Sequence, residues 1–394
     1  MMHLPAAWRI ALLVVAAFPL IYYVLACVAA WSFERTRPAS ELSCFTPPVS
    51  ILKPLHGVDF ASYENYASFC HQHYPEYEIL FAVHESTDPA AAVVERLIAD
   101  FPQREIKLLF DAEYFGANRK VNSLARLARE ARHEILALSD GDVRVTPQYL
   151  QNVVAPLQDP VVGAVTSFYR GIAQKNLGAE FEALGAAGGF FPGVLMAAWT
   201  EGVKFALGAS IATTKTWLQK IGGFEDIAPF LADDYEIGRR VAAAGGRVVL
   251  SHETVWTMYP AQTARGFWDH QLRWARTVRL CRPASYAALL FTQGLPWAIL
   301  ATLIAPRPWI AVAYLAAYLV LRITMAWVVG VSVVKDAVLR RRIALVPLWD
   351  ALHFLVWLAS FTSNHIVWGQ VEYVVKRGRM TPASTLVDAP VNPD

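Results

Sequence analysis

Residues 135–145 read ILALSDGDVRV, an apolar run that ends in two closely spaced carboxylates. The first four residues are apolar without a break, which predicts a buried strand. Asp140 and Asp142 then follow on either side of a glycine. Because like charges this close repel each other, the pair favours a bound cation or a retained proton. The Asp-Gly dipeptide is also common in turns, and a turn would present both carboxylates equally well.

The chain before and through this stretch alternates between strand and helix patterns over residues 48–140. This alternation predicts an α/β fold with a mostly parallel sheet that helices cover on both faces. Ligands of such sheets bind at the carboxyl ends of the strands, which is where Asp140 and Asp142 fall. The predicted strands are 48–55, 77–84, 105–110 and 134–140, and the predicted helices are 89–102 and 120–131.

The acidic pair has the chemistry of a divalent metal site. Mg²⁺ and Mn²⁺ prefer oxygen ligands and commonly use one or two carboxylates, with substrate phosphates completing the shell. We therefore expect Asp140 and Asp142 to hold a metal ion together with a diphosphate. The same pattern fits a phosphatase or a polymerase, so the pair alone leaves the reaction open.

A second acidic cluster lies in FLADDYEIGRRVAAAGGRVV, residues 230–249. The pattern predicts a helix that ends at Gly245 and a strand after it. Asp233 and Asp234 would stand at the start of this helix, where one aspartate is explained by capping alone. The second carboxylate is then available to act as a general base.

A third element, FWDHQLRWARTVR at residues 267–279, is a helical stretch rich in arginine and tryptophan. Arg273 and Arg276 could hold a diphosphate through forked hydrogen bonds. A basic amphipathic helix at a membrane surface explains the same pattern, and Trp268 and Trp274 suit that interface.

The composition indicates a membrane protein. Hydrophobic residues make up 55% of the 394 residues and charged residues only 17%, with a mean hydropathy of +0.32. The formal net charge is only +2, whereas nucleic-acid-binding proteins are strongly basic, so we expect no nucleic-acid partner. The four cysteines are scattered, which favours neither a disulfide framework nor a zinc site.

The first apolar segment, Ile10–Trp31, is uncharged and long enough to span a bilayer. It runs into Trp31 and Phe33 without a small-residue cleavage site, which favours an anchor over a cleaved signal peptide. Arg35 and Arg37 follow it and only Arg9 precedes it, so the positive-inside rule predicts that the bulk of the protein is cytoplasmic.

The C-terminal third holds three more apolar segments, 286–305, 308–334 and 343–361. Three full spans would place the basic stretches KDAVLRRR and VKRGRM on opposite sides of the membrane, although both favour the cytoplasm. One segment is therefore expected to be re-entrant or interfacial. The segment with Asp350 and His353 is the candidate, because ionisable groups are costly in lipid.

Taken together, these segments resemble the ceramide glucosyltransferase family, glycosyltransferase family 21, whose catalytic domain has the GT-A fold. The resemblance implies an N-terminal anchor and linker over 1–45, a GT-A domain over 46–282, and a membrane region with a basic tail over 283–394. HIVWGQVEYVV (365–375) is similar to the stretch that follows the last membrane segment in many such enzymes. The motifs that carry the resemblance are VSILKPLHG (49–57), ESTDPAAAVV (85–94), GANRKVNSL (116–124), LSDGDVRVTPQYL (138–150), GGFEDIAPFLADDYEIG (222–238) and LRWART (272–277).

The resemblance also assigns roles to single residues. The family's three aspartates fall on Asp88, on the pair Asp140 and Asp142, and on Asp234. By resemblance Asp88 contacts the nucleotide of a UDP-sugar, with Lys120 and Asn122 nearby. Asp142, assisted by Asp140, holds Mg²⁺ or Mn²⁺, and Asp234 is the catalytic base. Asp88 also suits a helix N-cap, because Pro89 follows it.

The arginine and tryptophan of the family's last motif fall on Arg273 and Trp274, which the resemblance places among the donor-binding residues. The sequence departs from the family at His270, where the motif usually has Gln or Arg. This departure puts in doubt any contact assigned to that side chain.

The resemblance implies an inverting enzyme that transfers a sugar, glucose above all, from a UDP-sugar to the hydroxyl of a membrane lipid such as ceramide. Its expected location is the cytoplasmic face of a bacterial plasma membrane. A related bacterial branch transfers N-acetylglucosamine to hopanoid lipids and shares nearly all the motifs. The sequence also leaves room for a polysaccharide synthase, a polyisoprenyl-phosphate sugar transferase or a non-catalytic membrane scaffold.

Overall fold

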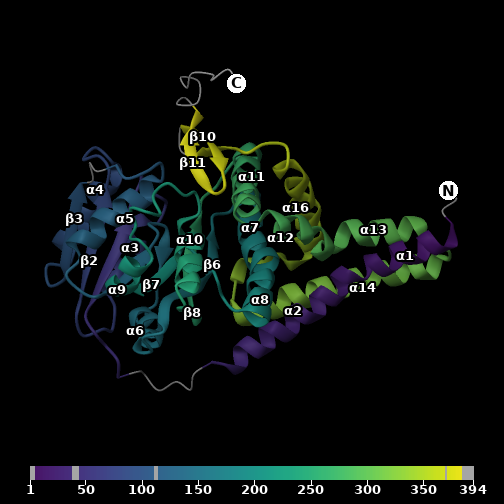
Figure 1. Cartoon of the computed structure of the whole chain (residues 1–394), viewed down its shortest axis with the longest axis horizontal. Helices are drawn as coiled ribbons and strands as arrows, with labels where there is room; N and C mark the ends of the chain where they lie inside the picture. Colours follow the sequence, from purple (N-terminus) through teal and green to yellow (C-terminus); the bar gives the residue numbers. More distant parts are fainter. Residues whose placement is uncertain (1–4, 38–43, 111–113, 369–370, 384–394) are drawn as a thin grey trace. The chain divides into compact units, whose positions relative to one another are not determined.

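The structure, a computed structural model, describes residues 5–37, 44–110, 114–368 and 371–383 (Figure 1). The chain divides into two compact units that alternate along the sequence. The first unit comprises Met1–Arg37, Ala173–Thr200 and Ala261–Asn364. The second unit comprises Pro38–Ile172, Glu201–Pro260 and His365–Asp394. The residues 173–200 therefore group with the N-terminal and C-terminal apolar segments, and the end of the chain groups with the α/β unit.

The second unit is built on a sheet with the strand order β3-β2-β1-β4-β7-β6-β8-β5. Strands β3, β2, β1 and β4 are parallel to one another, as the alternation of strand and helix predicts. Strand β7 pairs antiparallel with β4 and β6, and β5 pairs antiparallel with β8, so the sheet is mixed. The strands are β1 (Val49–Pro54), β2 (Tyr77–Val83), β3 (Glu105–Phe110), β4 (Ile135–Ser139), β5 (Val143–Arg144), β6 (Val162–Ala173), β7 (Ser210–Thr214) and β8 (Arg247–Tyr259).

Capping side chains mark the starts of helices α4 and α5. Asp88 caps α4 by accepting a hydrogen bond from the N–H of Ala90, and Pro89 occupies the first helical position. Asn118 caps α5 by accepting from the N–H of Val121. The helices are α3 (Ser62–Cys70), α4 (Pro89–Asp100), α5 (Arg119–Glu130), α6 (Tyr149–Val154), η1 (Ala155–Gln158), α9 (Lys215–Lys220) and α10 (Asp233–Ala243).

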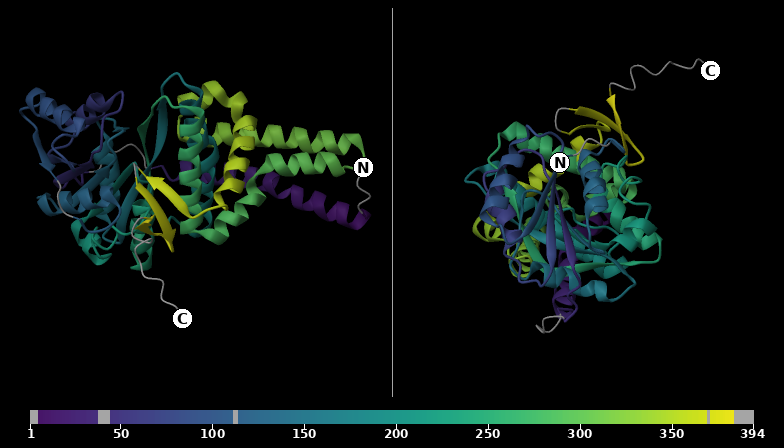
Figure 2. Two further views of the ribbon diagram at one scale, coloured as in Figure 1. Left: turned by 90° about the horizontal axis from the view of Figure 1, so that it is seen from above. Right: turned by 90° about the vertical axis from the view of Figure 1, so that its left-hand side faces the viewer.

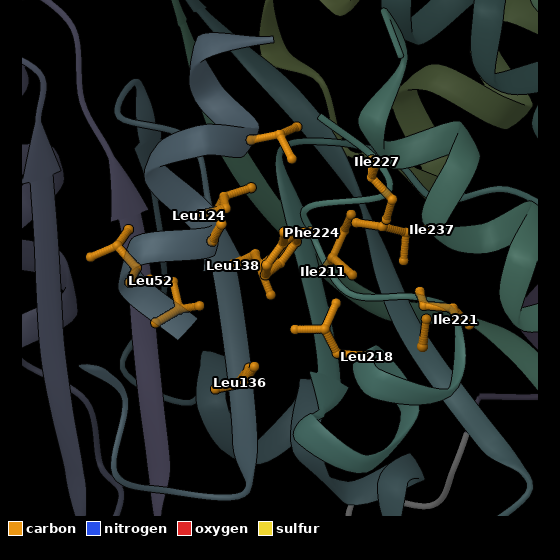
Figure 3. Close-up of a cluster of buried hydrophobic side chains, with 14 of the residues drawn as sticks. Leu52, Leu124, Leu136, Leu138, Ile211, Leu218, Ile221, Phe224, Ile227 and Ile237 are labelled. Atoms are coloured by element: carbon orange, nitrogen blue, oxygen red, sulfur yellow. The ribbon is translucent and has the colours of Figure 1, made fainter. Parts of the chain in front are cut away.

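The apolar core of this unit joins helix α5 to the sheet (Figure 3). Leu124 of α5 meets Leu52 of β1 and Leu136 and Leu138 of β4 in one buried cluster. Each such side chain contributes about 1.5–3 kcal/mol by leaving water. The core thereby fixes the start of α5 and the end of β4 against each other, and these two places carry Lys120 and Asp140.

A small three-stranded sheet completes the second unit, formed by β9 (His365–Trp368), β10 (Val371–Lys376) and β11 (Arg379–Pro382). The β10–β11 turn uses Arg377 and Gly378, both with positive φ (50° and 79°), as tight hairpin turns require. This hairpin pairs with the segment just before α10: Leu231 N–H donates to Gly378 O at 3.0 Å, and Met380 N–H donates to Pro229 O at 2.8 Å.

The first unit is helical, as Figures 1 and 2 show. Within the described residues, four helices are long and apolar enough to cross a membrane: Ala6–Arg35, Leu177–Glu201, Pro308–Val333 and Ala337–Ser360. A fifth span would be the pair Pro283–Thr292 and Gly294–Ile304, which bends by 48°. The helices are α1 (Ala6–Ala16), α2 (Phe18–Arg35), α7 (Leu177–Leu184), η2 (Gly185–Phe190), α8 (Phe191–Glu201), α11 (Ala264–Cys281), α12 (Pro283–Ala288), η3 (Leu289–Thr292), α13 (Gly294–Ile304), α14 (Pro308–Ala326), η4 (Trp327–Val333), α15 (Ala337–Arg342), η5 (Ile343–Leu345) and α16 (Val346–Ser360).

A buried ion pair explains the ionisable residue in α16. The guanidinium of Arg322 in α14 donates to both oxygens of Asp350, with the shortest contact at 2.8 Å. It also donates to the carbonyl of Gly188 at 2.9 Å, and Tyr318 donates its hydroxyl to Asp350. The segment with Asp350 was expected to be re-entrant, but it belongs to one of the four long apolar helices. Arg322 compensates the charge of Asp350 there. The bend falls instead between residues 292 and 294.

Candidate functional site

The acidic pair stands at the carboxyl end of β4, in a turn. Ser139 is the last residue of β4, and Val143 N–H donates to Asp140 O at 3.3 Å. The main-chain carbonyl of Asp142 accepts from Met258 N–H of β8 at 3.1 Å. The Asp-Gly dipeptide therefore forms a turn, as the dipeptide alone predicts, and this turn presents both carboxylates.

Lys120 connects the acidic pair to the second acidic cluster. Its Nζ lies 2.6 Å from Asp140 Oδ1 and 3.2 Å from Asp233 Oδ2. Although burial opposes the charge, Asp140 and Asp233 together hold the pKa of Lys120 above its usual value. The two motifs, almost a hundred residues apart in the sequence, therefore meet through one ammonium group.

Asp234 lies beside the same lysine. An added Cβ on Gly208 would lie 3.2 Å from Asp234 Oδ2 and 3.6 Å from Lys120 Nζ, so both side chains line the space at Gly208. Burial and the neighbouring Asp233 raise the pKa of Asp234 to about 7, while Lys120 opposes this shift. A carboxylate of this pKa exchanges protons near neutrality, as a general base must.

Neither aspartate of the second cluster caps helix α10 with its side chain, because the N-cap position is Ala232 and no side chain accepts there. Asp234 Oδ1 accepts from the adjacent Tyr235 N–H at 2.7 Å. Capping, which explains one aspartate from the sequence, thus does not account for this pair in the described structure.

Asp142 lines an open pocket. The pKa of Asp142 is raised to about 7. Burial is the largest cause, the negative charges of Asp140 and Asp59 add to it, and the positive charge of Lys53 opposes it. A cation at Asp142 would offset this repulsion. The pocket is lined by Pro54, Leu55, His56, Gly57, Asp59, Tyr66, Gly141 and Asp142.

The donor set fits a hard divalent ion that takes further ligands from elsewhere. Asp140 and Asp142 supply carboxylate oxygens, which Mg²⁺ and Mn²⁺ prefer. Within the described ranges, no group of three or more His, Cys, Asp or Glu residues forms a metal-binding cluster. The remaining positions of a coordination shell would therefore be filled by phosphate or water oxygens.

Asp88 borders the same pocket. Besides capping α4, its two carboxylate oxygens both accept from Gly57 N–H at 3.0 Å. His56 Nδ1 lies 3.4 Å from Asp88 Oδ2. The N-cap explanation for Asp88 is thus confirmed, and the same side chain also holds the pocket wall at residues 56–57.

Asn122 is buried, and its side chain is bonded to the loop before α5. Its Oδ1 accepts from Phe115 N–H and Gly116 N–H, and its Nδ2 donates to Gly116 O at 2.9 Å. These contacts shape the loop that leads to Lys120. The side-chain amide of Asn122 is therefore already bonded to the loop. If Asn122 affects a nucleotide, it does so by shaping this loop.

Arg273 and Trp274 lie in α11 of the first unit, whereas the carboxylates belong to the second unit. His270, one turn earlier, contacts the buried carboxylate of Glu182 in α7, and its ring packs against Trp274 with centroids 5.6 Å apart. Burial lowers the pKa of Arg273, while Glu182 opposes this shift. Donor binding by Arg273 and Trp274 stays a prediction.

Three residues around the pocket were not predicted from the sequence: Lys53, Asp59 and Tyr66. Lys53 is fully buried in β1, and its Nζ donates to Asp140 O at 2.7 Å. The available signal was a lysine inside an apolar parallel strand, where charged residues are rare. Asp59 and Tyr66 gave no comparable signal, because acidic and aromatic residues are common in loops and helices.

Comparison with known proteins gives the same assignment as the motifs. The profile of the family described as Glycosyl transferase family 21 matches residues 11–381. Ceramide glucosyltransferase 1 of Caenorhabditis elegans is 27% identical over 256 residues, which cover 62% of this chain and 53% of the relative. Ceramide glucosyltransferase 3 of the same organism is 26% identical over 266 residues, covering 65% of this chain and 56% of the relative. The chain thus spans about half the length of these curated relatives.

One solved structure shares the fold over most of the chain. It is described as mannosyltransferase PcManGT from Pyrobaculum calidifontis in complex with GDP-Man and Mn²⁺. The TM-score is 0.50 at 19% identity, and the match covers 88% of this chain and 99% of that chain. The predicted α/β fold of GT-A type is therefore confirmed.

Proposed function

Because the chain belongs to glycosyl transferase family 21, we propose that it transfers a sugar from a UDP-sugar to the hydroxyl group of a membrane lipid. The observation that carries the proposal is the convergence of Asp140, Asp233 and Asp234 on Lys120, beside Asp142 and its open pocket. The relatives described as ceramide glucosyltransferases support a sphingolipid acceptor and glucose as the sugar.

Asp142, with Asp140, would hold the divalent ion, Mg²⁺ or Mn²⁺. The solved relative of the same fold was described with Mn²⁺, which supports a metal of this class. When bound, the ion supplies positive charge against the diphosphate of the leaving nucleotide. Burial first, and then the charges of Asp140 and Asp59, raise the pKa of Asp142, and a cation beside this carboxylate would favour its ionised form.

The donor nucleotide would occupy the pocket at Asp142. Asp88 would hold the pocket wall at residues 56–57 in place for the nucleotide. Asn122 would hold the loop that leads to Lys120. Lys120 would contact the diphosphate as a point charge. Donor binding by Arg273 and Trp274 is proposed from the family motif that these two residues match.

Asp234 would be the general base. It accepts the proton of the lipid hydroxyl as that oxygen attacks the anomeric carbon of the sugar. The bond from the anomeric carbon to the lipid oxygen forms while the bond to the diphosphate oxygen breaks, and UDP leaves with that electron pair. A single displacement of this kind inverts the carbon, so an α-linked donor gives a β-glycoside.

The long apolar helices support a lipid acceptor within a membrane. The proposed location is the cytoplasmic face of a bacterial plasma membrane. Each CH₂ group exposed to water costs about 0.8 kcal/mol, so a lipid is best glycosylated at the bilayer. The basic residues after the first span, Arg35 and Arg37, support the cytoplasmic side. The glycine-rich segment 184–199 is helical and lies within the candidate span Leu177–Glu201, and we propose it as part of the acceptor entrance.

The decisive experiment incubates the purified protein with native membrane lipids and a panel of radiolabelled UDP-sugars. We expect one labelled glycolipid, which mass spectrometry identifies as a ceramide, a hopanoid or another acceptor. Excess EDTA should stop its formation, and added Mn²⁺ or Mg²⁺ should restore it. A labelled polymer, or no labelled lipid with any sugar, would overturn the proposal.

Two substitutions serve as controls for that experiment. Asp142→Asn and Asp234→Asn should each abolish the labelled lipid while the protein still elutes as a folded species. Equal label with wild type and both variants would show that transfer arises from a contaminant or from a scaffold that binds another enzyme.

A further inference from the structure

Lys53 is an unusual residue for the interior of a parallel sheet. It lies in β1, between β2 and β4, and its side chain is fully buried. Lysine is almost never fully buried unless it is paired, because taking an ammonium group out of water is costly. A fold that keeps a lysine here has partners for it.

Those partners belong to the turn that carries the acidic pair. Nζ of Lys53 donates to the main-chain carbonyl of Asp140 at 2.7 Å and lies 3.4 Å from Ser139 Oγ. It also stands 3.9 Å from the ring centroid of Phe69 in α3, a cation–π distance. These contacts attach Lys53 to the backbone of the turn and occupy neither of the two carboxylates.

Packing from the same strand end supports the turn at its next residue. An added Cβ on Gly141 would lie 3.1 Å from Leu55 and 3.9 Å from the hydroxyl of Tyr66. The turn therefore rests on residues 53–55, with the ammonium group as its polar contact. Loss of that contact would remove the shortest hydrogen bond to the Asp140 carbonyl and leave the longer bond from Val143 N–H at 3.3 Å.

The charges around Lys53 are consistent with this attachment. Burial lowers the pKa of Lys53 to about 7, while Asp140 and Asp142 oppose the shift. Lys53 in turn opposes the rise in the pKa of Asp142. The lysine is therefore part of the same electrostatic cluster as the pair that it supports.

We propose that Lys53 is a positioning residue that holds the 139–142 turn so that Asp142 faces the pocket and Asp140 faces Lys120, and thereby sets the affinity for the divalent ion. The inference rests on the proposed function for the identity of the ion. Lys53 would act through the backbone and would touch neither the donor nor the acceptor.

Two effects of Lys53 have opposite signs, and this makes the proposal testable. As a nearby positive charge, Lys53 weakens the attraction of the site for a cation, so its removal would tighten metal binding. As the support of the turn, Lys53 orders the ligands, so its removal would weaken metal binding. The proposal requires the second effect to exceed the first.

The test measures Mn²⁺ binding to the full purified chain without any donor, from the electron paramagnetic resonance signal of free Mn²⁺. Lys53→Met keeps the length of the aliphatic stem without the ammonium group, and Lys53→Gln keeps a neutral donor. We expect Lys53→Met to weaken Mn²⁺ binding at least tenfold and Lys53→Gln by a smaller factor. The matched control is Lys220→Met, since Lys220 also stands over an aromatic ring, Trp217, but is exposed on α9.

Transfer kinetics give the second readout. With saturating metal, the KM for the UDP-sugar should rise with Lys53→Met and kcat should stay within about threefold. Equal or tighter Mn²⁺ binding by Lys53→Met would overturn the proposal. If that variant does not fold, Lys53→Gln carries the test, and its Mn²⁺ binding must fall at least threefold. Because Mn²⁺ binding is measured without transfer, an inactive wild type would refute the proposed function alone.

Discussion

The ammonium group of Lys120 lies 2.6 Å from Asp140 Oδ1. This contact compensates the first carboxylate of the acidic pair, whereas the buried Lys53 contacts the main-chain carbonyl of Asp140 and the hydroxyl of Ser139. An added cation should therefore interact more favourably with Asp142 than with Asp140, whose charge Lys120 already compensates. The two carboxylates of one short motif thus have different electrostatic tasks.

The first prediction concerns Asp142→Asn. We expect this substitution to lower sugar transfer at least a hundredfold and to raise the stability of the metal-free protein. Burial and like charges raise the pKa of Asp142 from 3.8 to about 7, so its ionised form destabilises the fold. The gain should be at most about 4 kcal/mol, since one pKa unit corresponds to about 1.4 kcal/mol.

The pH dependence of that gain follows from the direction of the shift. A folded-state pKa above the unfolded value means that the penalty is absent below pH 3.8, grows as the pH rises, and is complete above about 7. Apparent unfolding temperatures in detergent with EDTA, at pH 5 and pH 8, would measure it. A variant less stable than wild type at pH 8 would contradict the prediction.

The second prediction concerns the base. Since the pKa of Asp234 is about 7, kcat/KM should fall about tenfold per pH unit on the acid side of that value. Asp234→Asn should lower kcat by roughly two to four orders of magnitude. A profile measured between pH 5.5 and 8.5 that is flat would exclude Asp234 as the base.

Lys120 should shift this profile. It lowers the pKa of Asp234, so Lys120→Met should move the acid limb of kcat/KM to higher pH, besides weakening donor binding. The residual activity of this variant, measured at saturating donor, separates the two effects. An unchanged limb would show that Lys120 and Asp234 do not interact during the reaction.

The third prediction concerns the buried ion pair of the first unit. Asp350→Ala leaves the guanidinium of Arg322 buried without its carboxylate and should cost about 3–5 kcal/mol. The double variant Arg322→Met with Asp350→Leu should recover most of the loss, because replacing a whole buried pair by apolar groups is often neutral. The yield of folded protein and its apparent unfolding temperature measure both, and a double variant as unstable as Asp350→Ala would contradict this account.

The fourth prediction concerns the position where the sequence departs from its family. Glu182→Ala removes the carboxylate that His270 contacts and should lower transfer about tenfold, by loosening the helix that carries Arg273 and Trp274. His270→Gln keeps a hydrogen-bond donor toward Glu182 and should stay within about threefold of wild type. A double-mutant cycle with Glu182→Ala and His270→Ala should show strong coupling, whereas additive losses would mean that the pair is not a unit.

The parallel half of the sheet was predictable because its strands have a clear local pattern. Residues 49–54, 77–83 and 135–139 are nearly continuous apolar runs between helical patterns. Strands β6 and β7 are also buried, but they lie among glycine-rich and apolar stretches that a membrane protein offers in several places. Their antiparallel pairing depends on contacts distant in sequence, which periodicity does not report.

The candidate site residues were chosen from local motifs, and their roles stay predictions. Asp140, Asp142 and Asp234 were named because paired carboxylates at the ends of elements suit metal and base chemistry, and because the family's motifs fall on them. That Lys120 bridges Asp140 and Asp233 depends on how α5 and α10 pack against the sheet. The role of Asn122 as a loop support likewise follows from a buried geometry that no local pattern encodes.

The pairing of Leu231 with Gly378 has a consequence for how the protein is made. The segment that leads into Asp234 is bonded to a hairpin that the ribosome synthesises later than α16. The hydrogen bonds of Leu231 and Pro229 with the hairpin can therefore form only after α16 has been synthesised. The second unit is completed by residues that follow the long apolar helices in the sequence.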